Sequence, residues 1–178
     1  MEITIREINK EAIPHVNQCD SSFTVDSKLA LSADNGRISY MVLDIPPYGK
    51  QYQPEEADYH EYVSNPDKTI FLAYVDNEPA GQIRIRKNWN GFAYIDDFAV
   101  DAQHRRRGIG RALMQRAMEW ARDKGLPGIM LETQNNNVAA CRLYESFGFE
   151  LGGFDAYLYK GLNPATDETA LYWYLMLE

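Results

Sequence analysis

The chain has 178 residues, of which 45% are hydrophobic and 12% aromatic, and its formal net charge is −8. This length and composition can bury a substantial core, so we expect residues 1–178 to form a single domain. The acidic balance argues against nucleic acid as the main partner and is compatible with a small cationic substrate.

Targeting and metal-binding signals are missing from the sequence. The segment 1–7 alternates like a strand and lacks the basic-then-apolar order of a signal peptide, and no apolar run approaches the roughly 20 residues that cross a bilayer. Cys19 and Cys141 are too few for a disulfide framework or a zinc site, and the three histidines form no metal pattern. We therefore expect a reduced, cytoplasmic enzyme without membrane or metal.

The hydrophobic pattern predicts alternating strands and helices along the chain. In chain order, the expected elements are a strand at 3–8, partly helical structure in 10–35, a strand at 38–43 ended by Pro46 and Pro47, a short helix around 55–63, a hairpin of 70–75 and 80–85, a strand at 92–100, a helix at 110–124, a strand at 128–133, a short helix at 139–146, and strands near 149–154 and 170–177.

The order strand, helix, strand between residues 92 and 133 implies a right-handed parallel crossover. In such units ligands bind beyond the carboxyl ends of the strands. The loop 105–110 and the residues after Thr133 are therefore expected at one edge of the sheet. The predicted fold class is α/β, with a mixed central β-sheet flanked by helices around this central strand-helix-strand unit.

Two glycines, Gly108 and Gly110, stand where the helix of residues 110–124 begins. Glycine costs about 1 kcal/mol relative to alanine inside a helix, but it lets backbone N–H groups approach an anion closely. Arg105, Arg106 and Arg107 lead into this turn in an otherwise acidic chain, which favours a phosphate-bearing cofactor. The spacing completes neither a dinucleotide fingerprint nor a P-loop. The alternative is a solvated basic turn before an ordinary helix.

Two motifs carry a resemblance to a known superfamily. Arg105-x-x-Gly108-x-Gly110 resembles the acetyl-CoA pyrophosphate loop of the GNAT N-acetyltransferases. Asn137-x-x-Ala140-x-x-x-Tyr144, followed by Gly148-Phe149, resembles the second signature of the same superfamily. The resemblance covers about residues 70–155 and implies the GNAT fold, with acetyl-CoA as the acetyl donor and no metal.

A narrower resemblance extends to the C-terminal strand. Segments 131–137, 151–155, 159–160 and 168–174 look like the streptothricin acetyltransferases, which acetylate an amino group on the β-lysine arm of the antibiotic streptothricin. This implies direct acetyl transfer to a primary amine and resistance to that antibiotic. A protein or polyamine N-acetyltransferase and a non-catalytic acyl-CoA-binding sensor are the alternatives.

The superfamily resemblance implies which residues hold the donor. Backbone groups of the strand at 92–100 would pair with the pantetheine amides like an added strand, the amides of the arginine loop would hold the pyrophosphate, and Asn137 would contact the pantetheine arm. The cofactor-binding set is Phe98, Ala99, Val100, Arg105, Arg106, Arg107, Gly108, Ile109, Gly110, Arg111, Asn137 and Ala140.

The reaction itself demands an acid and a base. An alkylammonium with a pKa near 10.4 is neutral in only about one molecule per thousand at pH 7, so attack on a thioester needs a proton acceptor near the amine. The resemblance places Tyr144 beside the sulfur, as the general acid; its alternative is an aromatic core residue. Glu132, on the strand after the crossover, and Asp96 or Asp97, on the strand before it, are considered as the base, of which Glu132 and Asp96 are the candidates.

Asp97 is the third acid near the predicted site. Strand alternation places it on the face opposite Asp96, and we assign it to substrate binding. All three carboxylates could also bind the cation while solvent removes the proton.

Cys141 would permit a covalent acetyl-enzyme, but no His or Asp stands at an activating spacing, so a buried thiol is the better interpretation. Part of the strand at 170–177 could join a homodimer, which the sequence leaves open.

Overall fold

The computed structural model describes residues 2–178, which divide into two compact units. The first unit consists of the residues up to Phe23, Gln51–Ile129 and Leu177–Glu178. The second consists of Thr24–Lys50 and Met130–Met176. Whether the units act as the single domain expected from the sequence stays a prediction.

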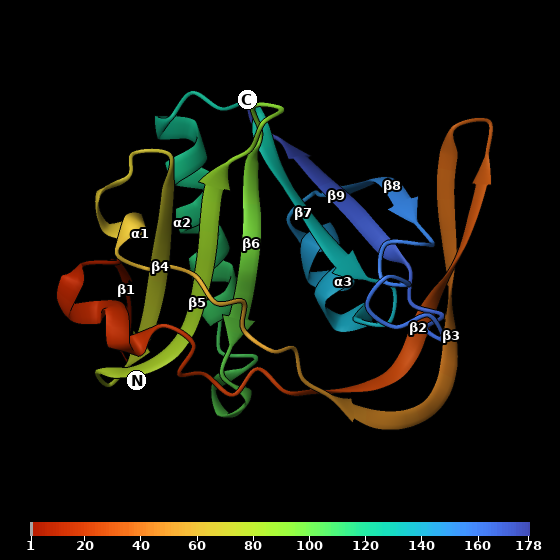
Figure 1. The fold of residues 1–178 in the computed structure, drawn as a ribbon, viewed down its shortest axis with the longest axis horizontal. Helices are drawn as coiled ribbons and strands as arrows, with labels where there is room; N and C mark the ends of the chain where they lie inside the picture. The colour runs from red at the N-terminus through yellow and green to blue at the C-terminus, as the bar shows by residue number, and fades with distance from the viewer. Residues whose placement is uncertain (1) are drawn as a thin grey trace. The chain divides into compact units, whose positions relative to one another are not determined.

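The first unit is an antiparallel sheet covered by a helix (Figure 1). Its strands lie in the order β1-β4-β5-β6, and each neighbouring pair is antiparallel. The bounds are β1 (Ile3–Glu7), β4 (Lys68–Val75), β5 (Glu78–Lys87) and β6 (Ala93–Val100), with the helix α2 (Ile109–Asp123) and the short helices η1 (Lys10–His15), α1 (Glu61–Ser64) and η2 (Ala102–His104).

Helix α2 packs closely on the strands because one of its faces is apolar and β5 offers a glycine there. Leu113, Ala117 and Trp120 are buried, as the sequence pattern predicts. A Cβ added to Gly81 would lie 3.0 Å from the carbonyl oxygen of Ala99 and 3.1 Å from the side chain of Leu113. Glycine at this point of β5 therefore brings the start of α2 close to the sheet.

The second unit holds most of β7, together with the strands and helix that follow it. Strands β7 (Gly128–Gln134), β9 (Ala170–Met176) and β8 (Glu150–Asp155) are neighbours in the order β7-β9-β8, and β8 and β9 are antiparallel. Helix α3 (Val138–Ser146) follows β7. Strands β2 (Phe23–Asp34) and β3 (Arg37–Lys50) form a separate two-stranded sheet.

The prediction that residues 10–35 are helical in part holds for their first residues, but the strand in their second half was not predicted. Only η1 is helical, and the chain then forms the strand β2. The reason is a period of two that the helical interpretation passed over, because Val25, Ser27 and Leu29 are buried while Asp26 is exposed and Lys28 half-buried.

The prolines do not end the next strand. Strand β3 continues through Pro46 and Pro47 to Lys50. Each strand of a two-stranded sheet has an unpaired edge, where a residue without an N–H group is tolerated. The helix expected at 55–63 is also shorter and later than predicted, since α1 covers only Glu61–Ser64.

The other predicted elements are confirmed. The hairpin of β4 and β5, the antiparallel pairing of β5 with β6, helices α2 and α3, and the last two strands all form close to their predicted bounds. Gly125 and Gly148 end α2 and α3 with φ of 67° and 92°, as glycine after a helix commonly does.

Candidate acetyl-transfer site

The loop that follows β6 is tied to the N-terminal segment by backbone and carboxylate hydrogen bonds. The Asp20 amide donates to Asp101 Oδ2 at 3.0 Å, and the Ala102 amide donates to the Asp20 carbonyl at 2.9 Å. Arg105 Nε donates to the carbonyl of Val100 at 3.1 Å. Arg105 therefore has a structural role in the turn. Neither Asp20 nor Asp101 was predicted to hold the loop, although Asp101 directly follows a strand and precedes a turn, which is itself a capping signal.

The loop then enters α2 through two left-handed residues. Arg106 has φ of 62°, and Gly108, the N-cap of α2, has φ of 86°. The first helical hydrogen bond runs from the Ala112 amide to the Gly108 carbonyl at 3.0 Å, and Gly108 has no side chain with which to cap the helix. The amide-rich first turn and the exposed arginines before it suit an anionic diphosphate, so this loop fits the predicted donor.

We expect Gly108→Ala to destabilise the protein by about 1–2 kcal/mol, because a Cβ in the left-handed region is strained even where space is open. Thermal unfolding would measure this. Gly161→Ala is the matched control, since that glycine also faces open space but has no positive φ. Equal melting temperatures for the two variants would contradict the strain argument.

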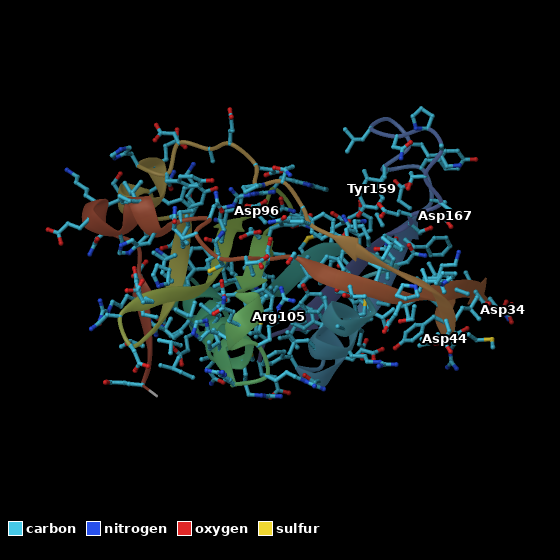
Figure 2. All side chains as sticks on the ribbon, turned by 90° about the horizontal axis from the view of Figure 1, so that it is seen from below. Asp34, Asp44, Asp96, Arg105, Tyr159 and Asp167 are labelled. Carbon is cyan, nitrogen blue, oxygen red and sulfur yellow. The ribbon has the colours of Figure 1, made fainter. Side chains whose placement is uncertain are left out.

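Asp96 lies at a β-bulge. Arg84 pairs with Asp97 and Ile85 with Ile95, so Asp96 is the extra residue on β6. The regular alternation from which Asp97 was placed on the face opposite Asp96 is therefore interrupted at this point of the strand. Arg86 binds the Asp96 carboxylate, with Nε 2.9 Å from Oδ2. Burial raises the pKa of Asp96, and the Arg86 and Arg84 guanidinium groups oppose that rise. Figure 2 labels Asp96 and Arg105 in this unit.

Asp97 belongs to a separate hydrogen-bond network. Gln82 Nε2 donates to Asp97 Oδ2 at 2.6 Å and to Asn17 Oδ1 at 2.8 Å, and Asn17 Nδ2 donates to the Tyr59 hydroxyl at 2.7 Å. Burial raises the pKa of Asp97, which the Gln82 hydrogen bond opposes. Asp97 is therefore a half-buried, hydrogen-bonded carboxylate. Neither Gln82 nor Asn17 was singled out from the sequence.

Glu132 lies on β7 in the second unit, and its carboxyl group has a strongly raised pKa. Burial, followed by the nearby Glu168 carboxylate, raises its pKa from 4.5 to about 7. Its Oε1 atom is buried and has no hydrogen-bond partner in the described part of the chain. A carboxylate that changes protonation near neutral pH and has a vacant acceptor atom is suited to accept a proton.

Tyr144 and Asn137 both belong to α3. The Tyr144 ring is buried and lies 5.8 Å from the Phe149 ring and 6.4 Å from the Trp173 ring between centroids. Asn137 caps the helix, because its Oδ1 accepts from the Ala140 amide at 3.3 Å. The structure thus gives each residue a packing or capping role beside its predicted function.

The predicted site residues therefore fall into two groups. The first unit holds the loop, the β6 backbone, Asp96 and Asp97, whereas Glu132, Asn137, Ala140 and Tyr144 lie in the second.

The raised pKa of Glu132 predicts a stability effect. The folded state disfavours the charged form, so the penalty is absent below about pH 4.5, grows between pH 4.5 and 7, and is complete above pH 7. We expect Glu132→Gln to raise Tm at pH 8 by about 2–4 °C, which is roughly 1 kcal/mol in a chain of this size, and to have no such effect at pH 4. Thermal melts at both pH values measure it. A Tm that falls at pH 8 would contradict the prediction.

The prediction that Cys141 is a buried thiol is confirmed. Cys141 is buried in α3, and burial together with Glu145 raises its pKa to about 12. Cys19 is partly buried, and burial together with Asp101 and Asp97 raises its pKa to about 11. Both thiols are thereby poor nucleophiles at neutral pH, which disfavours a covalent acetyl-enzyme.

Across residues 2–178, no three His, Cys, Asp or Glu side chains gather as metal ligands would. Within the same range, every helix is too short or too polar to span a bilayer.

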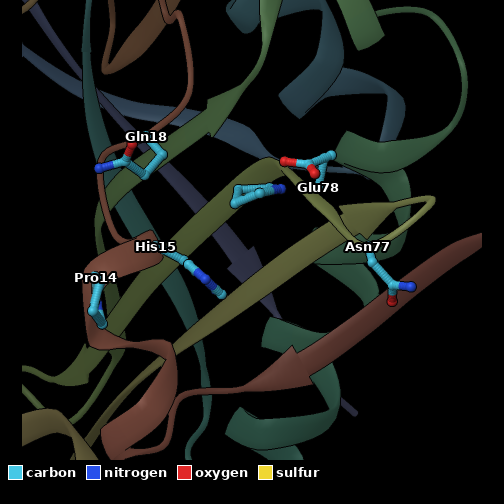
Figure 3. A pocket seen from close by; sticks show the side chains of 6 residues that line it. Pro14, His15, Gln18, Asn77 and Glu78 are labelled. Atoms are coloured by element: carbon cyan, nitrogen blue, oxygen red, sulfur yellow. The ribbon is translucent and has the colours of Figure 1, made fainter.

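A surface hollow of about 470 Å³ lies in the first unit beside η1 (Figure 3). Its lining residues are Pro14, His15, Gln18, Asn77, Glu78 and Pro79. His15 Nδ1 lies 2.8 Å from the Tyr74 hydroxyl, which holds the imidazole at the edge of β4. No predicted site residue lines this hollow, so we do not assign the reaction to it.

Known proteins resemble the chain over almost its whole length. Streptothricin acetyltransferase A of Bacillus subtilis is 38% identical over 159 residues, which are 89% of this chain and 91% of that protein. A Bacillus anthracis protein assigned as a streptothricin acetyltransferase, solved with acetyl coenzyme A, is 45% identical, with a TM-score of 0.92 over 100% of this chain and 99% of its own. Nourseothricin acetyltransferase is 30% identical with a TM-score of 0.83, and both chains are covered in full.

The family model for the acetyltransferase (GNAT) family matches residues 38–149, which include both motifs. The match and the solved relatives confirm the predicted α/β fold of the GNAT type and the enzyme class. The chain belongs to the acetyltransferase (GNAT) family.

Proposed function

We propose that this protein transfers an acetyl group from acetyl-CoA to a primary amine on the β-lysine arm of streptothricin and so confers resistance to the antibiotic. The observation that carries the proposal is the similarity to a streptothricin acetyltransferase over about nine-tenths of both chains. The net charge of −8 and the half-buried carboxylates agree with a cationic acceptor.

The acetyl donor supplies an activated thioester, and residues of this chain hold it. The first turn of α2, entered through Gly108, directs amides at the diphosphate, and Arg105, Arg106 and Arg107 add positive charge. The backbone of Phe98–Val100 pairs with the pantetheine amides. Asn137 and Ala140 at the start of α3 contact the same arm.

Glu132 serves as the base that removes the proton of the acceptor amine. Its pKa of about 7 leaves much of it ionised at pH 7–8, and its vacant Oε1 can accept the proton. Tyr144 serves as the acid that protonates the leaving sulfur. The Tyr144 ring is held by Phe149 and Trp173, so its hydroxyl has a defined position.

The two acids of β6 have different partners, and we assign them different roles. Asp97 binds the substrate cation through the network of Gln82 and Asn17. Asp96 is the second candidate base, but its carboxylate already receives two contacts from Arg86, which makes it the weaker candidate.

The test is release of free thiol from acetyl-CoA by the purified protein with streptothricin, spermidine or a lysine peptide as acceptor, with product masses by spectrometry. We expect rapid release and one added acetyl group on streptothricin alone. Activity confined to a comparator would keep the reaction but overturn the substrate. Binding of acetyl-CoA without turnover of any amine would favour a sensor. A cytoplasmic location and a homodimer remain predictions.

A further inference from the structure

A polar cluster in the second unit lies beside Glu132. It joins Tyr48 and Lys50 at the end of β3, Asn136 after β7, and Glu168 before β9. The side chains of Lys50 and Glu168 are only 16% and 23% exposed. Lys50 Nζ pairs with Glu168 Oε1, and Asn136 Nδ2 donates to the same oxygen at 2.8 Å and to the Tyr48 hydroxyl at 3.1 Å.

Two acceptor atoms at this cluster are buried and have no hydrogen-bond partner among residues 2–178. They are Asn136 Oδ1 and Glu132 Oε1. Asn136 is only 6% exposed, and its Oδ1 belongs to the same amide group that binds Glu168. A buried acceptor without a donor costs free energy. One such atom is on Asn136, which binds Glu168, and the other is on Glu132, whose pKa Glu168 raises, so both point to a ligand that brings N–H donors.

The charges of the cluster indicate what kind of donor is missing. Glu132 and Glu168 are close enough for the second to raise the pKa of the first, and Lys50 is the cation that pairs with Glu168. The two carboxylates therefore exceed the cations by one when Glu132 is ionised. An ammonium group supplies one positive charge and three N–H donors. It would neutralise the excess negative charge and donate to the two acceptor atoms that have no partner.

We propose that Glu168 and Asn136 bind the second, non-reacting ammonium group of a dicationic acceptor, and that Lys50 takes its place on Glu168 while the acceptor is absent. The proposal rests on the proposed function, because β-lysine carries two amino groups and Glu132 serves the one that reacts. Glu168 is then a specificity-determining residue that selects diamines over monoamines, and Lys50 is an internal competitor.

The first test compares the kinetics of Glu168→Gln with those of Asp167→Asn. Asp167 is the neighbouring acid and pairs with Lys28 at 3.1 Å, but its side chain is 83% exposed. At pH 9, where Glu132 is ionised with or without the Glu168 charge, we expect Glu168→Gln to raise KM for streptothricin about 10- to 100-fold, with kcat and the KM for acetyl-CoA unchanged, because one charge-assisted contact is lost. Asp167→Asn should leave all three constants unchanged. Equal behaviour of the two variants overturns the proposal.

The second test asks whether Lys50→Gln raises or lowers the KM for streptothricin. An internal competitor predicts that its removal lowers KM for streptothricin, about fivefold for one unit charge near a partly exposed site. An ion pair that only supports the fold predicts that KM rises in both Lys50→Gln and Glu168→Gln. The direction in which KM changes in Lys50→Gln therefore tests the proposal even if Glu168→Gln folds poorly.

The third test separates this proposal from the proposed function. Calorimetry compares 1,5-diaminopentane with pentylamine, which differ only in the second ammonium group. We expect the wild type to bind the diamine more tightly and Glu168→Gln to lose that difference. If this holds but streptothricin is not acetylated, the cation site stands and the proposed function fails. If streptothricin is acetylated while Glu168→Gln keeps the difference, the function stands and the cation site fails.

Discussion

Tyr144→Phe is expected to lose about 10²- to 10⁴-fold in kcat while the Kd for acetyl-CoA stays within about threefold. The change removes one hydroxyl and keeps the ring, whose packing against Phe149 and Trp173 is apolar. The fold and the donor site should therefore persist, and only the proton for the leaving sulfur is lost. Steady-state thiol release gives kcat, and calorimetry gives the Kd.

The matched control for this variant is Tyr157→Phe. Tyr157 lies in the same unit but is exposed, so removal of its hydroxyl should change neither constant. Full turnover in Tyr144→Phe would remove Tyr144 from the mechanism. A loss of donor binding as large as the loss of kcat would assign it to holding the donor.

Glu132→Gln tests the base through the pH dependence of the rate. A carboxylate can accept a proton only when it is ionised, so with a pKa of about 7 the wild-type kcat/KM should rise as the pH increases through 7. The variant should lack this rise and be about 10²- to 10⁴-fold slower at pH 8. Measurement of kcat/KM between pH 5.5 and 9 at saturating acetyl-CoA provides both results.

Glu145→Gln is the control for the loss of a carboxylate. Glu145 is exposed on α3, where it accepts from the Tyr40 hydroxyl. It should keep the wild-type profile. If Glu132→Gln keeps the pH-dependent rise and changes only the KM of the acceptor, Glu132 binds the cation and solvent removes the proton.

The sequence predicts the elements whose apolar pattern is regular. Helix α2 is an example, because Leu113, Ala117 and Trp120 repeat at helical spacing and a glycine stands at each end. The prediction failed where exposed polar residues dominate, as in β3, whose course through Pro46 and Pro47 depends on having one unpaired edge. No local pattern reveals which edge of a strand is paired.

The predicted site illustrates the same limit. Motif spacing predicts the candidate residues of the arginine loop and of α3, because their proposed roles depend on the backbone conformation of residues close to them in the sequence. The partners of the acids could not be predicted, since Gln82 is 15 residues from Asp97 and Glu168 is 36 residues from Glu132. Asp96 lies at a bulge, which strand alternation cannot foresee. Contacts between distant residues decide which carboxylate is neutralised and which is left ionisable.

The protonated state of the two thiols matters for an enzyme that releases coenzyme A at each turnover. Disulfide exchange requires a thiolate, and a pKa of about 11 or 12 leaves about one thiol per thousand or fewer ionised at pH 8. Cys19 and Cys141 are therefore expected to resist capture by oxidised coenzyme A. The protein should keep its acetylating capacity under oxidative stress, when disulfides of its own product accumulate.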